Sequence, residues 1–483
     1  MRYCTPSRVA RGLCLVLVFY LVLKFFPGLP FLNLKSLDVA GLRSGATFLA
    51  NSLIRVVPEK WLSPRGSWLK QLEMSEADFH HLEHYCEGPR LNETRDRKET
   101  LLAVQMLIRH GDRGALFAVK DESHISCPFD ESHSLPDTFL AYYHAASSAA
   151  TKSKTSAAFS HVPGMTGCLK GELTSKGVIQ HLQLGSSVRA RLGENSERWS
   201  LETVTVHSTY YPRTYQSALA FMHGLDPATE TIPRKIEIAP PGDHMFCTMA
   251  HTCNCKTSKN IGAEYNRLSK ELFELSPEKV SLTSRLLGII GSHLERPIEN
   301  RPTHVFDVLL QFACHGKRMP CFEGTCVTYH ELVDVITLLE NLSQKLSALP
   351  AVREFCILDA YGLLHTVTEN LQAIANGNMS KTPEKRFTLF SAHDSTVVPV
   401  MTALGLPFRI VIPYASFVMF ELYSVAGDGG NVYLRVIYNG EDVTASTIPC
   451  AGLTARAPHC PFRIFKEFID KDLKEEFEDA CKA

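Results

Sequence analysis

Residues 101–108, with the sequence LLAVQMLI, are apolar except for Gln105. The run is short and continuous, whereas the apolar positions of a surface helix recur every three or four residues. It therefore predicts a strand buried on both faces, as in a parallel sheet. Alternating or β-branched patterns predict four more strands, at residues 202–209, 386–391, 416–424 and 432–438.

Helical periodicity occupies much of the remaining chain. A helix is expected after Thr174, which suits its N-cap, and two more are expected at 210–222 and 396–404. Residues 235–375 lack clear strands and carry long helical patterns, such as 333–349. Strands that alternate with helices predict an α/β fold: a mostly parallel sheet flanked by helices, with a mainly helical insertion or cap at 235–375.

Other segments are less regular. Residues 121–166 are rich in Ser, His and Ala and are expected to form a long loop or insertion. The charged tail from Phe465 is expected to be helical with a solvated face. An amphipathic helix is expected at 68–87, and its three histidines suit either a metal site or, as we prefer, a solvated surface. These histidines are His80, His81 and His84.

The N-terminus has a pattern of its own. Residues 12–23, GLCLVLVFYLVL, carry no charge, follow three arginines, and resume their apolar character after Lys24. No pair of small residues follows, as a cleaved signal peptide would require. We therefore expect an uncleaved signal anchor at 12–32, a cytosolic tail at 1–11 and a lumenal remainder. Twelve helical residues span only about 18 Å, which suits a thin Golgi membrane.

The rest of the chain divides into a lumenal stem at 33–96 and an α/β core formed by 97–234 and 376–483, interrupted by the helical insertion. The net charge of −1 and a pI of about 7.0 provide no basic field for nucleic acid, so no nucleic-acid partner is expected. Three lumenal sequons predict glycosylation, at Asn92, Asn341 and Asn378.

Cysteine usage agrees with an oxidising compartment. The chain has 15 cysteines, of which Cys4 and Cys14 precede the expected lumenal part. The other thirteen predict several disulfides and one unpaired thiol. Cys247, Cys253 and Cys255 lie close together with a histidine, but their spacing fits no common zinc site, and disulfides are preferred.

Chemically active residues follow the first predicted strand directly. Arg109 and Arg113 offer forked donors that match phosphate oxygens, and His110 is a nucleophile that is largely neutral near pH 7. Gly111 would let the backbone turn sharply and approach a bound group. Ligands of open α/β sheets bind beyond the carboxyl ends of the strands. The alternative is a basic turn with an exposed histidine. Partner residues elsewhere in the chain would favour the phosphate site over this alternative.

Two later junctions supply such partners. Arg213 falls at the start of the helix after the strand at 202–209, where free N–H groups and the helix dipole favour anions. By itself Arg213 fits a surface arginine equally well. His393 and Asp394 follow the strand at 386–391. If the strands are parallel, all three junctions meet at one edge, an arrangement suited to phosphoryl transfer.

These motifs resemble the histidine acid phosphatase family: Arg-His-Gly-x-Arg at 109–113, Ser-Thr-x-x-x-Arg-Thr at 208–214, and a late His-Asp. The similarity extends over about residues 97–463. It implies that His110 attacks phosphorus and becomes phosphohistidine, and that Asp394 protonates the leaving oxygen. It also implies four phosphate ligands, with no metal or cofactor, since guanidiniums supply the positive charge. These ligands are Arg109, Arg113, Arg213 and His393.

One departure and one further similarity concern the substrate. The family often has proline two residues after its second motif arginine, where this chain has Ala115. The anchor, stem and phosphatase domain together are similar to a Golgi member that removes the 2-phosphate from xylose in the glycosaminoglycan–protein linkage region. That similarity implies a phosphorylated glycan on a proteoglycan core protein as substrate. Linkage-region glycosyltransferases are expected as partners. The anchor is expected to attach the chain to the membrane.

Other functions stay open at this point. A general acid phosphatase and an inositol polyphosphate phosphatase of the secretory pathway share the same motifs, and an inactive lumenal binding protein would have the same fold. Residues 450–456 also have the spacing of a cysteine phosphatase loop. A thiolate nucleophile needs reducing surroundings, so a disulfide from Cys450, for example to Cys460, is preferred.

Overall fold

The computed structural model describes residues 74–91, 98–120, 137–152, 170–193, 204–227, 236–247, 255, 258–377, 386–454 and 458–482. All of them belong to one compact unit, Trp68–Ala483. The expected tail and anchor, most of the stem, and the sequons at Asn92 and Asn378 lie outside the described residues. Within the described part of the chain, no helix combines the length and apolar character needed to cross a membrane.

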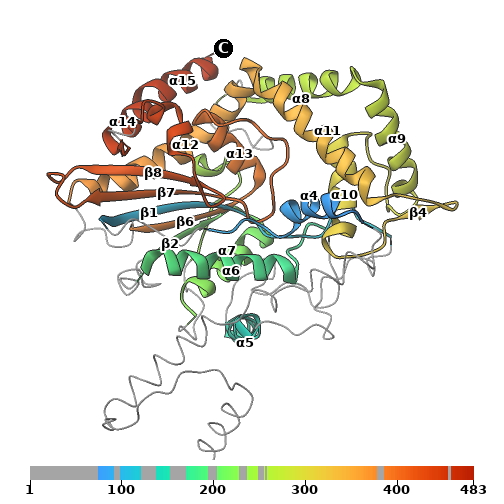
Figure 1. Cartoon of the computed structure of the whole chain (residues 1–483), viewed down its shortest axis with the longest axis horizontal. Helices are drawn as coiled ribbons and strands as arrows, with labels where there is room; N and C mark the ends of the chain where they lie inside the picture. The colour runs from blue at the N-terminus through green and yellow to red at the C-terminus, as the bar shows by residue number, and fades with distance from the viewer. Residues whose placement is uncertain are drawn as a thin grey trace, which may run out of the picture. The chain divides into compact units, whose positions relative to one another are not determined.

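A mixed eight-stranded sheet is the centre of the fold, with the order β10-β8-β7-β1-β6-β2-β3 and with β9 beside β8 (Figure 1). Parallel pairing joins β1 to β6, β6 to β2 and β2 to β3, while β7 and β8 continue the sheet in antiparallel fashion. The predicted α/β class is confirmed. The five predicted strands each begin and end within two residues of their expected bounds. The bounds are β1 Glu99–Arg109, β2 Val204–Ser208, β3 Glu237–Ile238, β6 Phe387–Ala392, β7 Phe417–Val425, β8 Val432–Tyr438, β9 Glu441–Asp442 and β10 Cys460–Pro461.

Strand β1 is buried on both faces, as its composition predicts. Val104, Met106 and Ile108 pack in one apolar cluster with α6 (Ser175–Leu192) and α7 (Pro212–Leu225). Ala103 and Leu107 belong to a second cluster with α12 (Pro350–Ala375) and α13 (Asp394–Ala403). Successive side chains of a strand point to opposite faces, so one apolar run serves two layers of helices. The polar exception, Gln105, accepts a 3.1 Å hydrogen bond from Asn370 of α12.

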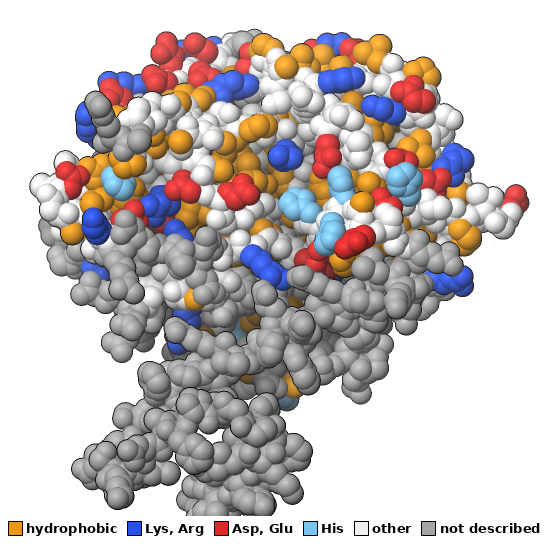
Figure 2. All heavy atoms as spheres, viewed as in Figure 1, with side chains coloured by type: hydrophobic (Ala, Val, Ile, Leu, Met, Phe, Trp, Pro, Cys, Tyr) orange, Lys and Arg blue, Asp and Glu red, His pale blue; other side chains and the backbone are white. Residues whose placement is uncertain are grey.

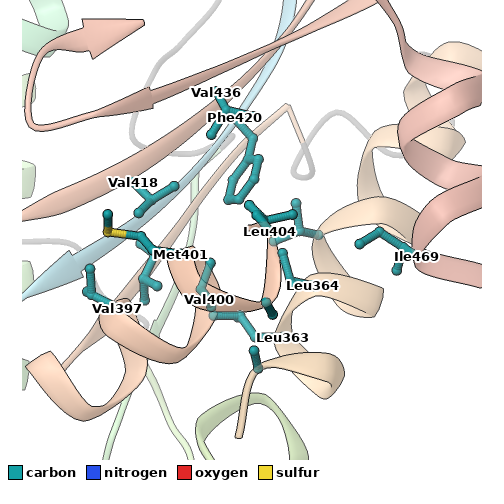
Figure 3. Packing of buried hydrophobic residues seen from close by; sticks show 14 of the residues in the cluster. Leu363, Leu364, Val397, Val400, Met401, Leu404, Val418, Phe420, Val436 and Ile469 are labelled. Carbon is teal, nitrogen blue, oxygen red and sulfur yellow. The ribbon is translucent and has the colours of Figure 1, made fainter. Parts of the chain in front are cut away.

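The second cluster is drawn in Figure 3, where side chains from α12, α13, β7, β8 and the C-terminal region meet. Helix α13 begins at Asp394, two residues before the predicted start. Helix α12 lies within the predicted insertion at 235–375, yet it packs directly on the sheet. The labelled side chains are Leu363, Leu364, Val397, Val400, Met401, Leu404, Val418, Phe420, Val436 and Ile469.

The remainder of the predicted insertion is mainly helical. Helix α11 begins with a complete capping box between Thr328 and Glu331. Asn341, the remaining predicted glycosylation site, is exposed on α11. The helices and short strands of this region are α8 Ser258–Glu274, α9 Pro277–Gly291, α10 Pro302–Cys314, β4 Cys321–Phe322, β5 Thr325–Cys326 and α11 Tyr329–Ser347.

Two expectations from the sequence were wrong in part. Within the expected loop at 121–166, the structure has helix α5, Asp137–Lys152. Its alanine content favours a helix, and Phe139, Tyr142 and Ala146 are buried in a cluster with α6 and α7. The charged tail is helical with an exposed face, as expected, but its other face is buried: α14 (Phe462–Glu467) and the π-helix Phe468–Leu473 contribute buried apolar side chains to the second cluster, and α15 (Lys474–Lys482) adds the partly buried Phe477.

Disulfides connect distant parts of the chain, as the oxidising compartment predicts. Cys86 of α4 (Glu76–Cys86) bonds to Cys314 at the end of α10, across 228 residues of sequence. The predicted pairing of Cys450 with Cys460 is confirmed, so this thiol is no phosphatase nucleophile. Among the described cysteines, Cys356 is the free one, and it is buried. Two further pairs between described cysteines are Cys255–Cys481 and Cys321–Cys326, and Cys247 is disulfide-bonded as well.

The histidines of α4 lie among carboxylates. Figure 2 shows His side chains beside acidic ones over α4. His80 lies 3.4 Å from Glu83 of the same helix, and His81 lies 3.5 Å from Glu340 of α11. His80 and His84 are exposed, which fits the solvated surface preferred for these histidines.

Candidate active site

The site begins where β1 ends, at the edge shared by the parallel strands β1, β6 and β2. His110 N donates to Ala392 O of β6 at 3.0 Å, so the turn after β1 continues the sheet pairing. The Arg109 side chain is buried; its Nη1 donates to Ile412 O, and its guanidinium lies over the Tyr414 ring at 4.6 Å. These contacts hold Arg109 in one conformation.

His110 is buried and held in a defined tautomer. Its Nδ1 lies 2.8 Å from Gly111 O, and a carbonyl oxygen can only accept, so Nδ1 carries the proton. The Nε2 lone pair is therefore available. Burial, followed by Arg213, Arg109 and Arg113, lowers the pKa of His110 well below its ordinary value. The imidazole is neutral throughout the physiological range, as a nucleophile requires.

Gly111 is needed for a reason other than the one expected. Its φ is not positive. A Cβ on Gly111 would lie 2.5 Å from Gly177 O of α6, and a Cβ on Gly177 would lie 2.3 Å from Asp112 O. The glycine pair thus lets the turn after β1 press against the start of α6, rather than against a bound group.

Arg113 is buried and fixed by the helical insertion. Its Nη2 lies 2.8 Å from Asp307 Oδ1 of α10, and its Nη1 donates to Gly114 O at 2.9 Å. Asp307 Oδ2 accepts from Leu116 N at 2.7 Å, so one carboxylate orders both the arginine and the loop behind it. No sequence motif pointed to Asp307, because it lies in an ordinary amphipathic helix far along the chain.

The second predicted junction places Arg213 in the first turn of α7, after Tyr211 as N-cap and Pro212. Arg213 Cζ lies 4.5 Å from the centre of the Tyr211 ring. Burial and then Arg113 lower the pKa of Arg213 to about 10. The guanidinium keeps its charge at neutral pH, and it is poised to gain from an anion because the neighbouring cations repel it.

His393 caps α13 and faces the other groups. Its Nδ1 lies 3.4 Å from Arg213 Nη2, so Nδ1 accepts, and its Nε2 donates to Thr209 Oγ1 at 2.9 Å. Its ring meets the His110 ring at 5.5 Å, edge to face. Burial and then Arg213 lower the pKa of His393 to about 3, although Asp394 opposes this effect. Thr209 was part of the matched motif but was not selected as a site residue.

Asp394, the first residue of α13, lies across from Arg109. Its Oδ2 is 2.9 Å from Arg109 Nη2, and its Oδ1 accepts from Ser395 N at 2.8 Å. Burial raises the pKa of Asp394, but Arg109, Arg113 and His393 outweigh it and hold the pKa below its ordinary value. The free site therefore has an ionised carboxylate paired with an arginine. An incoming dianion that engages Arg109 would weaken this pair and favour protonation.

Asp112, the variable position of the first motif, is fully buried and bonded on several sides. Its Oδ2 lies 2.8 Å from His315 Nε2 and accepts from Thr174 Oγ1 at 2.5 Å, while its N donates to Gln180 at 2.8 Å. His315 directly follows Cys314, which is disulfide-bonded to Cys86. The turn that carries His110 is thus tied to α6 and α10.

One group in the described part of the chain has the spacing of metal ligands: His365, Glu369 and Asp470. The Lys466 ammonium donates to Glu369 at 3.0 Å and to Asp470 at 2.6 Å. A cation of the protein already neutralises these carboxylates, and the group is separate from the His110 site.

Comparison with known proteins agrees with this geometry. A family model described as Histidine phosphatase superfamily (branch 2) matches residues 100–294 and 344–439, more than half of the chain. The chain belongs to this family. The matched residues of this histidine phosphatase include all three junctions of the site.

Two curated relatives and one solved structure extend the comparison. The 2-phosphoxylose phosphatase 1 of Xenopus tropicalis is 27% identical over 404 residues, covering 79% of this chain and 77% of the relative. The protein of that name from Danio rerio is 28% identical over 431 residues, covering 80% and 83%. The Hafnia alvei phytase in complex with myo-inositol hexakis sulphate has a similar fold, with a TM-score of 0.50, 15% identity, and coverage of 80% of this chain and 99% of the phytase. The family and the names of the relatives make this histidine phosphatase an enzyme that hydrolyses phosphate esters.

Proposed function

We propose that the enzyme hydrolyses phosphomonoesters through a phosphohistidine formed on His110. The observation that carries this proposal is the convergence of His110, Arg213, His393 and Asp394, from three separate strand ends, around one buried imidazole with a free Nε2. In the first step Nε2 attacks phosphorus, a P–N bond forms, and the ester P–O bond breaks. In the second step water attacks phosphorus, the P–N bond breaks, and inorganic phosphate leaves.

The phosphoryl group would be held by fixed positive charge. Arg109, Arg113 and Arg213 are each anchored by contacts that leave the guanidinium near His110, and His393 completes the set. Transition states of phosphoryl transfer carry charge on the non-bridging oxygens, so preorganised donors stabilise them without reorganisation. The His393 Nδ1, which accepts from Arg213 in the free site, would have to release this bond or reprotonate to donate to an oxygen.

Asp394 would supply the proton for the leaving oxygen. It is ionised while paired with Arg109, and the negative charge of a phosphate bound beside it would raise the carboxyl pKa. After the ester oxygen has taken this proton, the carboxylate can accept a proton from the attacking water. One residue thus serves as acid in the first step and as base in the second.

For the substrate we propose the 2-phosphate of xylose in the glycosaminoglycan–protein linkage region, on a proteoglycan core protein. The support is the printed name of the relatives, 2-phosphoxylose phosphatase 1, together with their coverage of most of both chains. The expected signal anchor would place the enzyme in the Golgi membrane with this domain in the lumen, close to linkage-region glycosyltransferases. The lumenal disulfides are compatible with that compartment.

A substrate panel on the purified chain tests this proposal. A 2-phosphoxylosyl glycoside should be hydrolysed with a higher kcat/KM than inositol hexakisphosphate or phenyl phosphate, and His110→Ala should release no phosphate from any of them. A preference for inositol hexakisphosphate would assign the enzyme to the inositol polyphosphate phosphatases. Equal activity on all three would indicate a general acid phosphatase, and no activity on any would leave a binding protein.

A further inference from the structure

An apolar surface borders the phosphate ligands at the mouth of the site. The Tyr211 side chain is 40% exposed, although it touches two of the proposed ligands. Its ring meets His393 at 4.9 Å, edge to face, and Arg213 covers it at 4.5 Å. The ring is therefore held in place by the phosphate ligands and still presents surface to whatever the phosphate is attached to.

Leu116 presents a second apolar side chain near the same arginine. It is 38% exposed, although its backbone is fixed by the bond from its N to Asp307. A Cβ built on Gly171 would lie 3.3 Å from Leu116 Cδ2 and 3.7 Å from Arg213 Nη1, so Leu116 and Arg213 border one glycine. Gly171 has a φ of +69° and no side chain, so Leu116 can approach it more closely than a Cβ would allow.

We propose that Tyr211 and Leu116 form the contact surface for the sugar ring that carries the phosphate, and that they select a neutral pyranose. This inference rests on the proposed function and deepens it. A pyranose ring presents C–H groups on its faces, and rigid aromatic and aliphatic side chains bind such surfaces at little cost in conformational entropy. Xylose has no charge besides its phosphate. An inositol polyphosphate would bring further phosphates against side chains that cannot pair with them.

The position of this surface connects it to the first motif, because Leu116 is the third residue after Arg113. The loop between them is not loose, because Asp307 holds both Arg113 and the Leu116 amide. The loop therefore fixes the position of Leu116 relative to Arg213. This position determines the width of the space available to the sugar ring.

The test compares a 2-phosphoxylosyl glycoside with ethyl phosphate, which has no ring, on the full chain. The selectivity ratio, kcat/KM for the glycoside divided by kcat/KM for ethyl phosphate, removes effects on phosphate chemistry. Tyr211→Ala and Leu116→Ala should each lower this ratio about three- to tenfold through KM, the usual worth of such a contact. Tyr211→Phe, which keeps the ring, should retain the wild-type ratio.

Ile464→Ala is the matched control, because Ile464 is 37% exposed and lies on α14. It should leave the ratio unchanged, and equal thermal midpoints would show that all variants fold. If the wild-type enzyme prefers the glycoside and both alanine variants keep the wild-type selectivity ratio, the inference about Tyr211 and Leu116 is overturned. The proposed function is then left intact. A wild-type enzyme that hydrolyses ethyl phosphate but not the glycoside overturns both.

Discussion

The role of Asp394 can be tested by changing the leaving group. Asp394→Asn keeps the shape of the side chain but only one of its two acceptor oxygens, so it can accept from Arg109 or from Ser395 N but not from both, and it cannot deliver a proton at neutral pH. For a sugar phosphate the leaving oxygen would depart as an alkoxide, so we expect the rate of phosphoenzyme formation to fall about 10²- to 10⁴-fold. This corresponds to about 3–5 kcal/mol of transition-state stabilisation.

The same substitution should matter far less for 4-nitrophenyl phosphate. Its leaving group is stable as an anion at neutral pH and needs no proton. Asp394 is paired with Arg109 at 2.9 Å in the free enzyme, so removing its charge also removes a competitor for the phosphate. We expect KM for both substrates to stay level or fall, because the Arg109 donor becomes available to the ligand.

Rapid-quench measurement of the first turnover separates these effects. The burst of released alcohol, nitrophenolate in one case and the sugar in the other, reports formation of the phosphoenzyme. The steady-state rate reports hydrolysis of the phosphoenzyme, where Asp394 would act as base. Asp334→Asn, at an exposed carboxylate of α11, serves as control. If Asp394→Asn slows the burst equally for the sugar phosphate and for 4-nitrophenyl phosphate, proton donation by Asp394 is refuted.

Three further predictions concern the imidazoles and the buried aspartate. His110→Ala should abolish trapping of labelled phosphate on the denatured protein; label that persists would place the nucleophile elsewhere. The pKa of His393 is about 3 when folded and near 6.5 when unfolded, so the unfolded state binds more protons between these values and stability should fall as pH drops from 6.5 towards 3. His393→Gln should flatten this dependence in denaturant titrations at pH 7, 5.5 and 4, and an unchanged slope would contradict it. Asp112→Ala should lower the free energy of unfolding by about 3 kcal/mol, because His315 and Thr174 lose their buried partner, and Asp112→Asn should cost clearly less in the same titration.

The strands and the ends of the strands could be predicted because their signals are local. The run at 101–108 is apolar on both faces of a strand, and the charged residues after it can only lie at the sheet edge. The parallel pairing of β1 with β6 and of β6 with β2 then brings residue 110 near residues 213 and 393 without further information. The roles assigned to these residues remain proposals for experiment.

The supporting contacts could not be predicted, because they join segments that carry no motif. Asp307 holds Arg113 across almost two hundred residues, and nothing in α10 distinguishes it from other polar positions of an amphipathic helix. Tyr414, stacked on Arg109, follows a stretch without strong pattern. Helix α5 was missed because its alanines and serines carry weak periodicity, and its burial against α6 and α7 is a tertiary effect.

The order of the strands has a consequence for biosynthesis. Strand β1 is the first of the sheet to leave the ribosome, yet both of its neighbours come late: β6 starts at Phe387 and β7 at Phe417. At 5–20 residues per second, an apolar segment with two unpaired edges waits roughly 15 to 60 s for its first partner. Such an exposed segment is an aggregation hazard, so the nascent chain has to be shielded during that interval. His110, the proposed nucleophile, acquires its surroundings only when synthesis is nearly complete, so a prematurely terminated chain would lack the site.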